Sequence, residues 1–213
     1  MDDGSYVLVG SVIEDEAALR AFLGMPSDTV RRKQLRALDA HARTFLEYSP
    51  FCLLATSGRD GSCDVSPRGD GPGFAAVLGD DRLAIPDRPG NRRLDSFRNI
   101  LENPGVGLLF LVPGMEETLR VNGRARLVRD APWFARLSAR APRPIVAILV
   151  EIDEVFFHCP KAFRRSRLWD QETWPVRAEL PTLGRILKDQ VGLAQPVAEV
   201  DRALEDSYAR SLY

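Results

Sequence analysis

The stretch of the chain with the clearest chemical potential is 87–94, which reads Asp-Arg-Pro-Gly-Asn-Arg-Arg-Leu. Asn91 is a residue type that caps helices, and the pattern predicts a helix that runs from there to Glu102. Arg92 and Arg93 would then lie in the first turn, where the helix dipole makes cations unfavourable unless an anion lies among them. Free backbone amides and guanidinium groups together form a phosphate site. The alternative is a solvated basic turn that the aspartates on either side neutralise.

A second candidate lies upstream, where Ser66, Pro67 and Arg68 follow a predicted strand. The stretch 69–73 after them contains three glycines. Because glycine has no side chain, a ligand could approach the backbone closely here. The glycine spacing does not fit a dinucleotide-binding fingerprint, and no predicted helix opens after it. The alternative is an ordinary turn rich in glycine and proline.

Residue types for other kinds of catalysis are scarce. The chain has two histidines, His41 and His158, and no Gly-x-Ser-x-Gly turn, so catalysis by a nucleophile and a base is not expected. Cys159 follows His158, but zinc requires spaced pairs of ligands and the sequence has no second pair, so we expect no metal site. Together with Cys52 and Cys63, this cysteine is predicted to be a free thiol in a reducing compartment.

Composition limits the classes of partner. The 213 residues include 29 lysines and arginines against 30 aspartates and glutamates, a net charge of −1, and 45% are hydrophobic. A globular chain of this size can bury a core without disulfides or metals. The balanced charge gives no long-range field that would attract nucleic acid or an anionic membrane. The sequence has no apolar run long enough for a signal or a membrane span, so we expect a cytoplasmic protein.

The first fifty residues have a helical pattern. Ser11 and Glu14 form a capping box that predicts a helix start. A second helix is predicted from Asp28 to Glu47 on the spacing of its apolar residues. His41 lies on or beside that apolar stripe, and we expect it to be packed or half-buried.

From residue 51 onward the sequence predicts short strands joined by turns. The clearest is Leu119–Leu127, where apolar or small residues alternate with arginine and asparagine with a period of two. Gly123 and Ala125 suit the inside of a closed barrel. The predicted strands are 51–56, 63–66, 74–78, 82–86, 106–112, 118–129 and 145–157, and the further predicted helices are 132–139, 160–168, 181–190 and 196–212. This pattern predicts a mainly β protein with α additions, built on a small antiparallel barrel.

Three of these segments together resemble the pyridoxamine 5′-phosphate oxidase-like family of FMN-binding split barrels. They are 64–70 (Asp-Val-Ser-Pro-Arg-Gly-Asp), 86–94, and 99–104 (Asn-Ile-Leu-Glu-Asn-Pro) followed by a strand. Two later stretches, 158–162 and 167–169, are similar to a bacterial subgroup of that superfamily described as FMN-dependent enzymes.

The resemblance covers 51–169 and implies a six-stranded antiparallel split β-barrel. The additions are an N-terminal helical segment, 1–50, and a helical C-terminal tail, 170–213, in one overall domain. The resemblance also implies a homodimer with FMN at the subunit interface and oxidoreductase activity on a small-molecule substrate, with a nicotinamide as a candidate electron donor. Because the flavin carries the chemistry in such enzymes, no catalytic side chain is assigned.

The resemblance also implies which residues hold the cofactor. Asn91, Arg92 and Arg93 match the phosphate-binding turn. Thr118 and Arg120 match a strand that the neighbouring subunit presents to the flavin. The full set of implied cofactor-binding residues is Ser66, Pro67, Arg68, Pro86, Asp87, Asn91, Arg92, Arg93, Thr118, Arg120, Lys161 and Trp169.

The C-terminal sequence departs from that of the authentic oxidase, which has an Arg-x-His substrate motif and a terminal Arg-Leu-x-Pro. This chain ends Ser-Tyr-Ala-Arg-Ser-Leu-Tyr at 207–213 and has neither motif. Oxidation of vitamin B6 phosphates is therefore not expected, and the substrate stays open. One alternative is a non-catalytic flavin-binding or flavin-sensing protein. Another is a related split barrel that uses haem or a deazaflavin, for which His158 is the only candidate axial ligand near the barrel.

Overall fold

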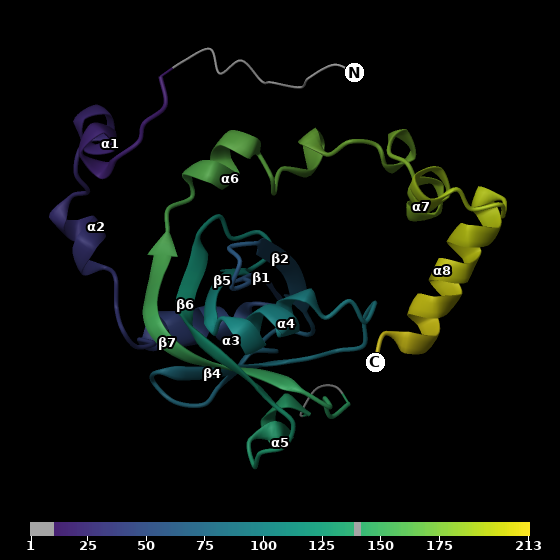
Figure 1. Ribbon diagram of the computed structural model, residues 1–213, viewed down its shortest axis with the longest axis horizontal. Coiled ribbons are helices and arrows are strands. Elements are labelled where there is room, and N and C mark those ends of the chain that lie inside the picture. The colour runs from purple at the N-terminus through teal and green to yellow at the C-terminus, as the bar shows by residue number, and fades with distance from the viewer. Residues whose placement is uncertain (1–10, 139–141) are drawn as a thin grey trace. The chain divides into compact units, whose positions relative to one another are not determined.

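The computed structural model describes residues 11–138 and 142–213, and the chain divides into two compact units, 1–34 and 35–213. The first unit contains two short helices, which are drawn in purple in Figure 1. Neither of them buries a residue. Their bounds are Glu16–Leu23 for α1 and Asp28–Arg32 for α2.

The first helix begins later than the sequence pattern predicts. Asp15 caps it by accepting a hydrogen bond from the amide of Ala18 at 2.7 Å. The predicted capping box of Ser11 and Glu14 is therefore wrong, because both residues precede the helix. Aspartate is as good an N-cap as serine, so the sequence offered both Ser11 and Asp15 as caps, and the helix begins after Asp15.

The second predicted helix, 28–47, is interrupted, and its C-terminal part is a separate helix, α3 (Ala40–Tyr48). Between α2 and α3, Leu35 forms a β-bridge with Val155, with N–O distances of 2.9 and 2.8 Å. A residue paired with a strand cannot also make helical hydrogen bonds, so the helix stops. His41 is exposed on α3, so the expectation that it is packed is wrong.

The second unit is built on one antiparallel sheet of seven strands in the order β2-β1-β5-β6-β7-β4-β3. The strands curve around a common interior, with β6 and β7 the longest of them (Figure 1). Their bounds are Phe51–Ser57 (β1), Cys63–Gly69 (β2), Ala76–Val77 (β3), Arg82–Pro86 (β4), Gly105–Leu111 (β5), Thr118–Val128 (β6) and Ala147–His158 (β7).

Two details of the predicted barrel are wrong. The sheet has seven strands rather than the six that the resemblance implies, and the shortest of them, β3, lies within the predicted strand 74–78 and pairs with β4, Ala76 opposite Ala84. The sheet is also not closed, because no pairing among the described residues joins its edge strands β2 and β3. The architecture is mainly β with helical additions, and it resembles a split barrel.

A β-bulge lies where β6 pairs with β7. Asn122 is opposite Glu154, but the next residue, Gly123, is opposite Ile152, so that Asp153 is an extra residue on β7. A Cβ atom at Gly123 would lie 2.1 Å from the carbonyl oxygen of Glu151. The bulge therefore requires glycine at this position.

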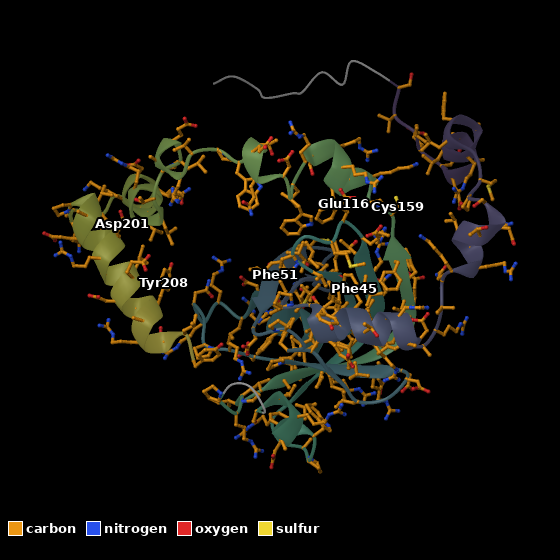
Figure 2. All side chains as sticks on the ribbon, turned by 180° about the vertical axis from the view of Figure 1, so that it is seen from behind. Phe45, Phe51, Glu116, Cys159, Asp201 and Tyr208 are labelled. Atoms are coloured by element: carbon orange, nitrogen blue, oxygen red, sulfur yellow. The ribbon has the colours of Figure 1, made fainter. Side chains whose placement is uncertain are left out.

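The main core lies between the concave side of the sheet and helices α3 and α4 (Asp95–Glu102). Phe45 of α3 packs edge-on against Phe157 at a centroid distance of 5.5 Å, and Figure 2 labels Phe45 on its helix. A smaller core forms around Phe134 in α5 (Phe134–Leu137), which is shorter than the predicted helix 132–139. The last residue of that prediction, Ala139, lies outside the described residues.

The C-terminal part is helical, as the sequence predicts, and none of its helices lies in the main core. The amide of Gly184 donates to Asp201 at 2.9 Å, which holds the last two helices together. Among the residues that the structure describes, no helix has both the length and the apolar character to cross a membrane. The bounds are Lys161–Ser166 (α6), Gln171–Thr173 (η1), Arg177–Glu179 (η2), Leu183–Val191 (α7) and Val197–Ser211 (α8).

Candidate ligand-binding site

One large cavity, of about 1490 Å³, gathers residues from five parts of the second unit. Ligand pockets for single drug-sized molecules span roughly 300–1,000 Å³, so this cavity has room for more than one ring system. Its walls are β2, the segment that follows β4, the start of α4, the segment 142–145, and α8. The lining residues that the sequence predicted are Ser66, Pro67, Arg68, Asp87, Asn91, Arg92 and Arg93.

The start of α4 differs from the prediction. Its helical residues begin at Asp95, and the N-cap is Leu94 in the left-handed region at φ 61°. Asn91 is not the cap, because its side-chain oxygen accepts a hydrogen bond from the amide of Arg93 at 3.0 Å and forms an Asx turn instead. Arg92, at φ 60°, and Arg93 therefore precede the helix rather than belong to its first turn.

This geometry leaves α4 without a capping side chain, because leucine has no acceptor to offer. Residues 94–97 line the cavity, so a helix start without a capping side chain, whose first amides have no partner within the helix, lies at the wall. The side chain of Arg93 is 74% exposed and donates from its Nε to Asp95 at 2.7 Å. The combination of a helix start with two adjacent arginines remains the chemistry of an anion site, although the local structure is not the predicted one.

Arg68 projects from β2 into a largely enclosed position on the cavity wall. Its terminal nitrogens donate to Asp87 and to Ser66, both at 3.3 Å, and its guanidinium carbon lies 5.6 Å from the ring centroid of Phe97. The Nε atom of Arg68 is buried and has no hydrogen-bond partner among the described residues. A buried donor without an acceptor is rare in proteins, and here it borders a cavity large enough for a ligand.

A chain of hydroxyl groups continues from this arginine. Ser66 and Ser96 lie 2.8 Å apart, and Ser96 donates to Asp64 at 2.7 Å. Since the single hydroxyl proton of Ser96 goes to the carboxylate, Ser66 must donate to Ser96 and accept from Arg68. The chain therefore runs in one direction, from guanidinium to carboxylate, and it fixes the orientation of every group in it.

Burial raises the pKa of the Asp87 carboxyl above its ordinary value, and the charges of Arg68 and Arg88 oppose that rise. Asp87 thus stands half-buried beside two guanidinium groups on the wall formed by the segment after β4. Its amide donates to the carbonyl of Val146 at 2.9 Å, which fixes the backbone where β4 ends.

Arg88 and Asp70 connect the cavity wall to Tyr213, which lies just beyond the end of α8. Arg88 donates from its Nε to Asp70 at 2.7 Å, and the phenol of Tyr213 donates to the same carboxylate at 3.0 Å. The guanidinium carbon of Arg88 also lies 5.8 Å from the ring centroid of Tyr213. Burial alone would raise the pKa of Asp70, but hydrogen bonds from Gly71, Arg88 and Tyr213 hold that pKa below its ordinary value.

Neither Arg88 nor Tyr213 was a predicted site residue. Arg88 lies within the stretch 87–94, so its position in that motif was an available signal. The signal for α8 was weaker, namely the helical spacing of uncharged residues at its C-terminal end. The α8 side of the cavity is lined by Leu204, Ser207, Tyr208, Ser211, Leu212 and Tyr213.

The other five predicted residues do not line this cavity. Pro86 is buried at the end of β4, next to the wall. Thr118 is buried at the start of β6, and the guanidinium carbon of Arg120 lies 5.3 Å from the ring centroid of Phe156.

Lys161 and Trp169 lie near the start and just beyond the end of α6. Lys161 is exposed. Trp169 donates to the carbonyl of Met115 at 2.8 Å and stacks on Phe163 at 5.6 Å. The structure therefore brings seven of the twelve predicted residues together in the cavity. The five that lie outside it are Pro86, Thr118, Arg120, Lys161 and Trp169.

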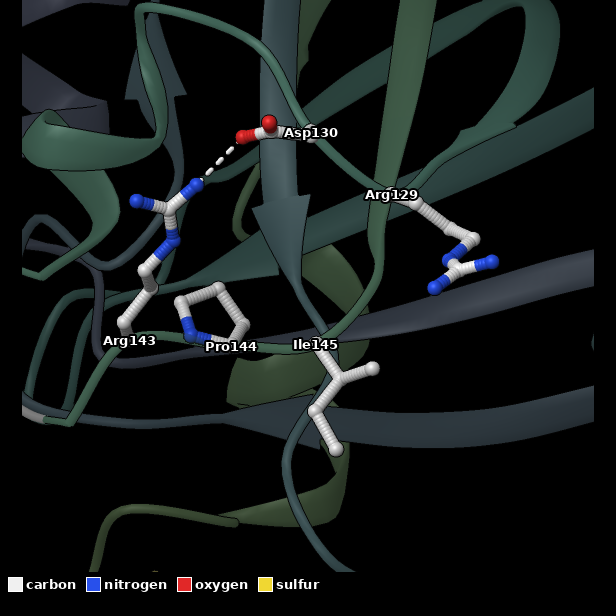
Figure 3. A pocket seen from close by; sticks show the side chains of 5 residues that line it. All are labelled: Arg129, Asp130, Arg143, Pro144 and Ile145. Atoms are coloured by element: carbon white, nitrogen blue, oxygen red, sulfur yellow. Dashed lines mark hydrogen bonds and ion pairs between the residues drawn. The ribbon is translucent and has the colours of Figure 1, made fainter.

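A smaller hollow of about 520 Å³ lies between Arg129, Asp130 and the segment 143–145. Figure 3 shows Arg143 reaching to Asp130, with which it forms an ion pair, while Arg129 points away. Ile145 is 82% exposed. This hollow contains no predicted site residue and no unpaired buried donor among the described residues, so it offers little recognition chemistry.

Comparison with known proteins defines the class. The model of a family described as pyridoxamine 5′-phosphate oxidase matches residues 38–159, which is more than half of the chain. The chain therefore belongs to the pyridoxamine 5′-phosphate oxidase family. The matched residues contain all seven strands, α3 and α4, but not α8.

Several solved structures are similar to the chain at low identity. HupZ of Group A Streptococcus is 14% identical with a TM-score of 0.46, and the match covers 56% of this chain and 93% of that one. A protein named F420 reductase is 20% identical with a TM-score of 0.41, covering 57% and 98%. The FAD binding protein from Mycobacterium smegmatis is 16% identical with a TM-score of 0.41, covering 58% and 97%. No curated protein matches the chain.

Proposed function

We propose that the chain binds FMN in the large cavity and is an FMN-dependent oxidoreductase that acts on a small molecule. The observation that carries the proposal is the uncapped start of α4 beside Arg92 and Arg93, facing the same cavity as the unpaired Nε of Arg68. An anion and further acceptors on one ligand would satisfy both features, and FMN has a phosphate and a ring rich in acceptors. When bound, the flavin supplies the hydride chemistry.

In this proposal each wall has its own role. The backbone at the start of α4, with Arg92 and Arg93, binds the phosphate. Arg68 donates from its Nε to an acceptor of the cofactor, and the chain from Ser66 to Asp64 keeps that guanidinium in place. None of these groups needs to act as a nucleophile or a general base.

The proposal includes a homodimer in which Thr118 and Arg120 of the partner subunit complete the flavin site. Both residues lie outside the cavity of their own chain. Strand pairing aligns Leu53, Leu109, Arg120 and Phe156 in one row across four strands, and all four are half-buried in the single chain. A row that combines apolar side chains with a guanidinium is suited to cover the same row of a second copy.

Cofactor binding is tested by reconstitution of the purified protein with FMN, FAD, riboflavin, haem or a deazaflavin, followed by gel filtration and absorbance. We expect retention of FMN in preference to riboflavin, which lacks the phosphate. Retention of haem or deazaflavin but not of FMN would contradict the proposal. Haem is not favoured, because neither His41 nor His158 lines the cavity.

Catalysis and assembly are tested with the FMN-loaded protein. Anaerobic mixing with NADH or NADPH should bleach the flavin absorbance, and a protein that only senses flavin would stay oxidised with both donors. Sedimentation velocity should give twice the chain mass of 23.7 kDa. Arg120→Glu should lower both the dimer fraction and FMN affinity, whereas a flavin-loaded monomer would contradict the shared site.

A further inference from the structure

The inner face of α8 is uncharged although the helix as a whole is not. The side chains that line the cavity follow helical spacing at positions 204, 207, 208 and 211 and continue to the last residue, and none of them carries a charge. Six of the 15 residues of α8 are charged, and all six lie outside the cavity lining. They are Glu199, Asp201, Arg202, Glu205, Asp206 and Arg210.

This uncharged face is only partly covered by protein. α8 contains no buried residue, and Tyr208, Leu212 and Tyr213 remain 48%, 65% and 54% exposed. An amphipathic helix normally buries its apolar face against a core. Here that face borders the large cavity instead, so its natural occupant is a molecule that enters the cavity.

The other walls have a different character. They carry three carboxylates, those of Asp64, Asp87 and Asp95, and five guanidinium groups, which suit the anionic part of a ligand. These guanidinium groups belong to Arg68, Arg88, Arg92, Arg93 and Arg143. The cavity thus has a cationic side, where guanidinium groups outnumber carboxylates, and an uncharged side with two tyrosine rings, one of which contacts Arg88.

The uncharged wall is also held in place. Tyr213 donates to Asp70, which Arg88 binds from the other side, and the side chains of Asp70 and Arg88 are only 5% and 15% exposed. Asp70 follows β2 and Arg88 follows β4, so the end of α8 is attached to the same strands that carry the cationic wall.

We propose that the α8 face, with Tyr208 at its centre, is the substrate wall of the site and binds an uncharged, ring-containing compound. This inference rests on the proposed function, since it assumes that the cofactor phosphate occupies the cationic side. Aromatic side chains favour stacked or edge-on contact with rings, and a wall without charges would leave an ionic substituent unpaired. Ser207 and Ser211 provide hydroxyl groups for an uncharged polar substituent.

The test uses 2-naphthamide and 2-naphthoate, which have the same shape and differ in charge, with the FMN-loaded protein in equilibrium dialysis. We expect 2-naphthamide to bind at least about tenfold more tightly than 2-naphthoate. Tyr208→Ala should weaken 2-naphthamide about tenfold and leave the FMN dissociation constant within about twofold. Tyr48→Ala, at a tyrosine of α3 that is 66% exposed and does not line the cavity, should change neither value.

A second pair of variants tests the charge of the wall without removing a ring. Ser207→Asp places a carboxylate on the lining face and should abolish binding of 2-naphthamide. Ala209→Asp adds the same charge to an exposed position outside the lining and should leave binding unchanged. Circular dichroism of both variants should show equal helix content.

Three results would overturn the proposal. Equal affinity for 2-naphthamide and 2-naphthoate would show that the wall does not select against charge. Loss of FMN affinity in Tyr208→Ala would place the flavin itself on α8, and loss of the dimer in that variant would assign the face to a second copy of the chain. If the parent protein does not bind FMN at all, the proposed function is contradicted. The affinities for 2-naphthamide and 2-naphthoate, measured without FMN, would then still test whether the α8 face selects an uncharged ring.

Discussion

Arg68 offers the sharpest test of the proposed cofactor site, because its replacement should change FMN affinity and unfolding free energy for two different reasons. In the structure its terminal nitrogens reach Asp87 and Ser66 at 3.3 Å, while its Nε is buried without a partner. A charge-assisted hydrogen bond is worth about 1.5–3 kcal/mol, and 1.4 kcal/mol is a factor of ten in affinity. If the Nε donates to FMN, Arg68→Met should weaken FMN binding by about one to two orders of magnitude.

The same substitution leaves Asp87 without its closest cation. The two side chains are 20% and 30% exposed, so solvent screens the pair in part, and the loss of unfolding free energy should be about 1–2 kcal/mol. Replacement of the carboxylate as well, in Arg68→Met with Asp87→Asn, should recover most of that stability but none of the FMN affinity. Titration of FMN fluorescence and urea unfolding measure the two effects.

The matched control is Arg98→Met, since Arg98 is exposed on α4 and does not line the cavity. This variant should retain both FMN affinity and stability. If Arg68→Met binds FMN as tightly as Arg98→Met does, Arg68 makes no contact with the cofactor and the argument from its unpaired donor fails.

Four further predictions follow from other features. Arg92→Ala and Arg93→Ala should each weaken FMN about tenfold in a fluorescence titration and leave riboflavin unchanged, and equal loss of both ligands would move the phosphate elsewhere. Turnover of pyridoxamine or pyridoxine phosphate, followed by oxygen uptake, should stay below about 1 s⁻¹, a tenth of a median enzyme rate. Gly123→Ala should lower unfolding free energy by about 3 kcal/mol in urea, whereas Gly71→Ala, where a Cβ meets nothing within 4 Å, should be close to neutral. Asp70→Asn should cost about 2 kcal/mol at neutral pH, and because the folded-state pKa of Asp70 is lowered, the difference from the parent should shrink as pH falls below 3.8.

The strands were largely predictable because their signal is local. Alternation along Leu119–Leu127 depends only on which side chains face the core, and β6 contains that whole segment. The run 82–86 was predicted with the bounds that β4 has in the structure. The residue pattern also predicted a strand at 74–78, but its length was not predictable, because only Ala76 and Val77 pair with β4.

The candidate site was predictable in its residue types but not in its backbone. Asparagine can cap a helix or close an Asx turn with the same oxygen, and the sequence does not distinguish the two. Arg92 and Leu94 adopt left-handed backbone angles that residues other than glycine seldom have, so the tertiary structure imposes this turn. The contribution of α8 was missed because its uncharged face borders a cavity whose other walls come from segments far away in the sequence.

The bulge between β6 and β7 gives Asp153 a role that its own side chain does not reveal. The residue is exposed, so its identity should vary freely, and as the extra residue of the bulge it has no partner on β6 in the register of the two strands. Deletion of this one residue would leave a regular strand in which Glu154 to His158 keep their partners on β6 and their faces, so Val155 would still face the core. Scans of substitutions and of deletions should both find this position tolerant, whereas the loss of one residue in the regular part of β7 would exchange the faces of the strand beyond it.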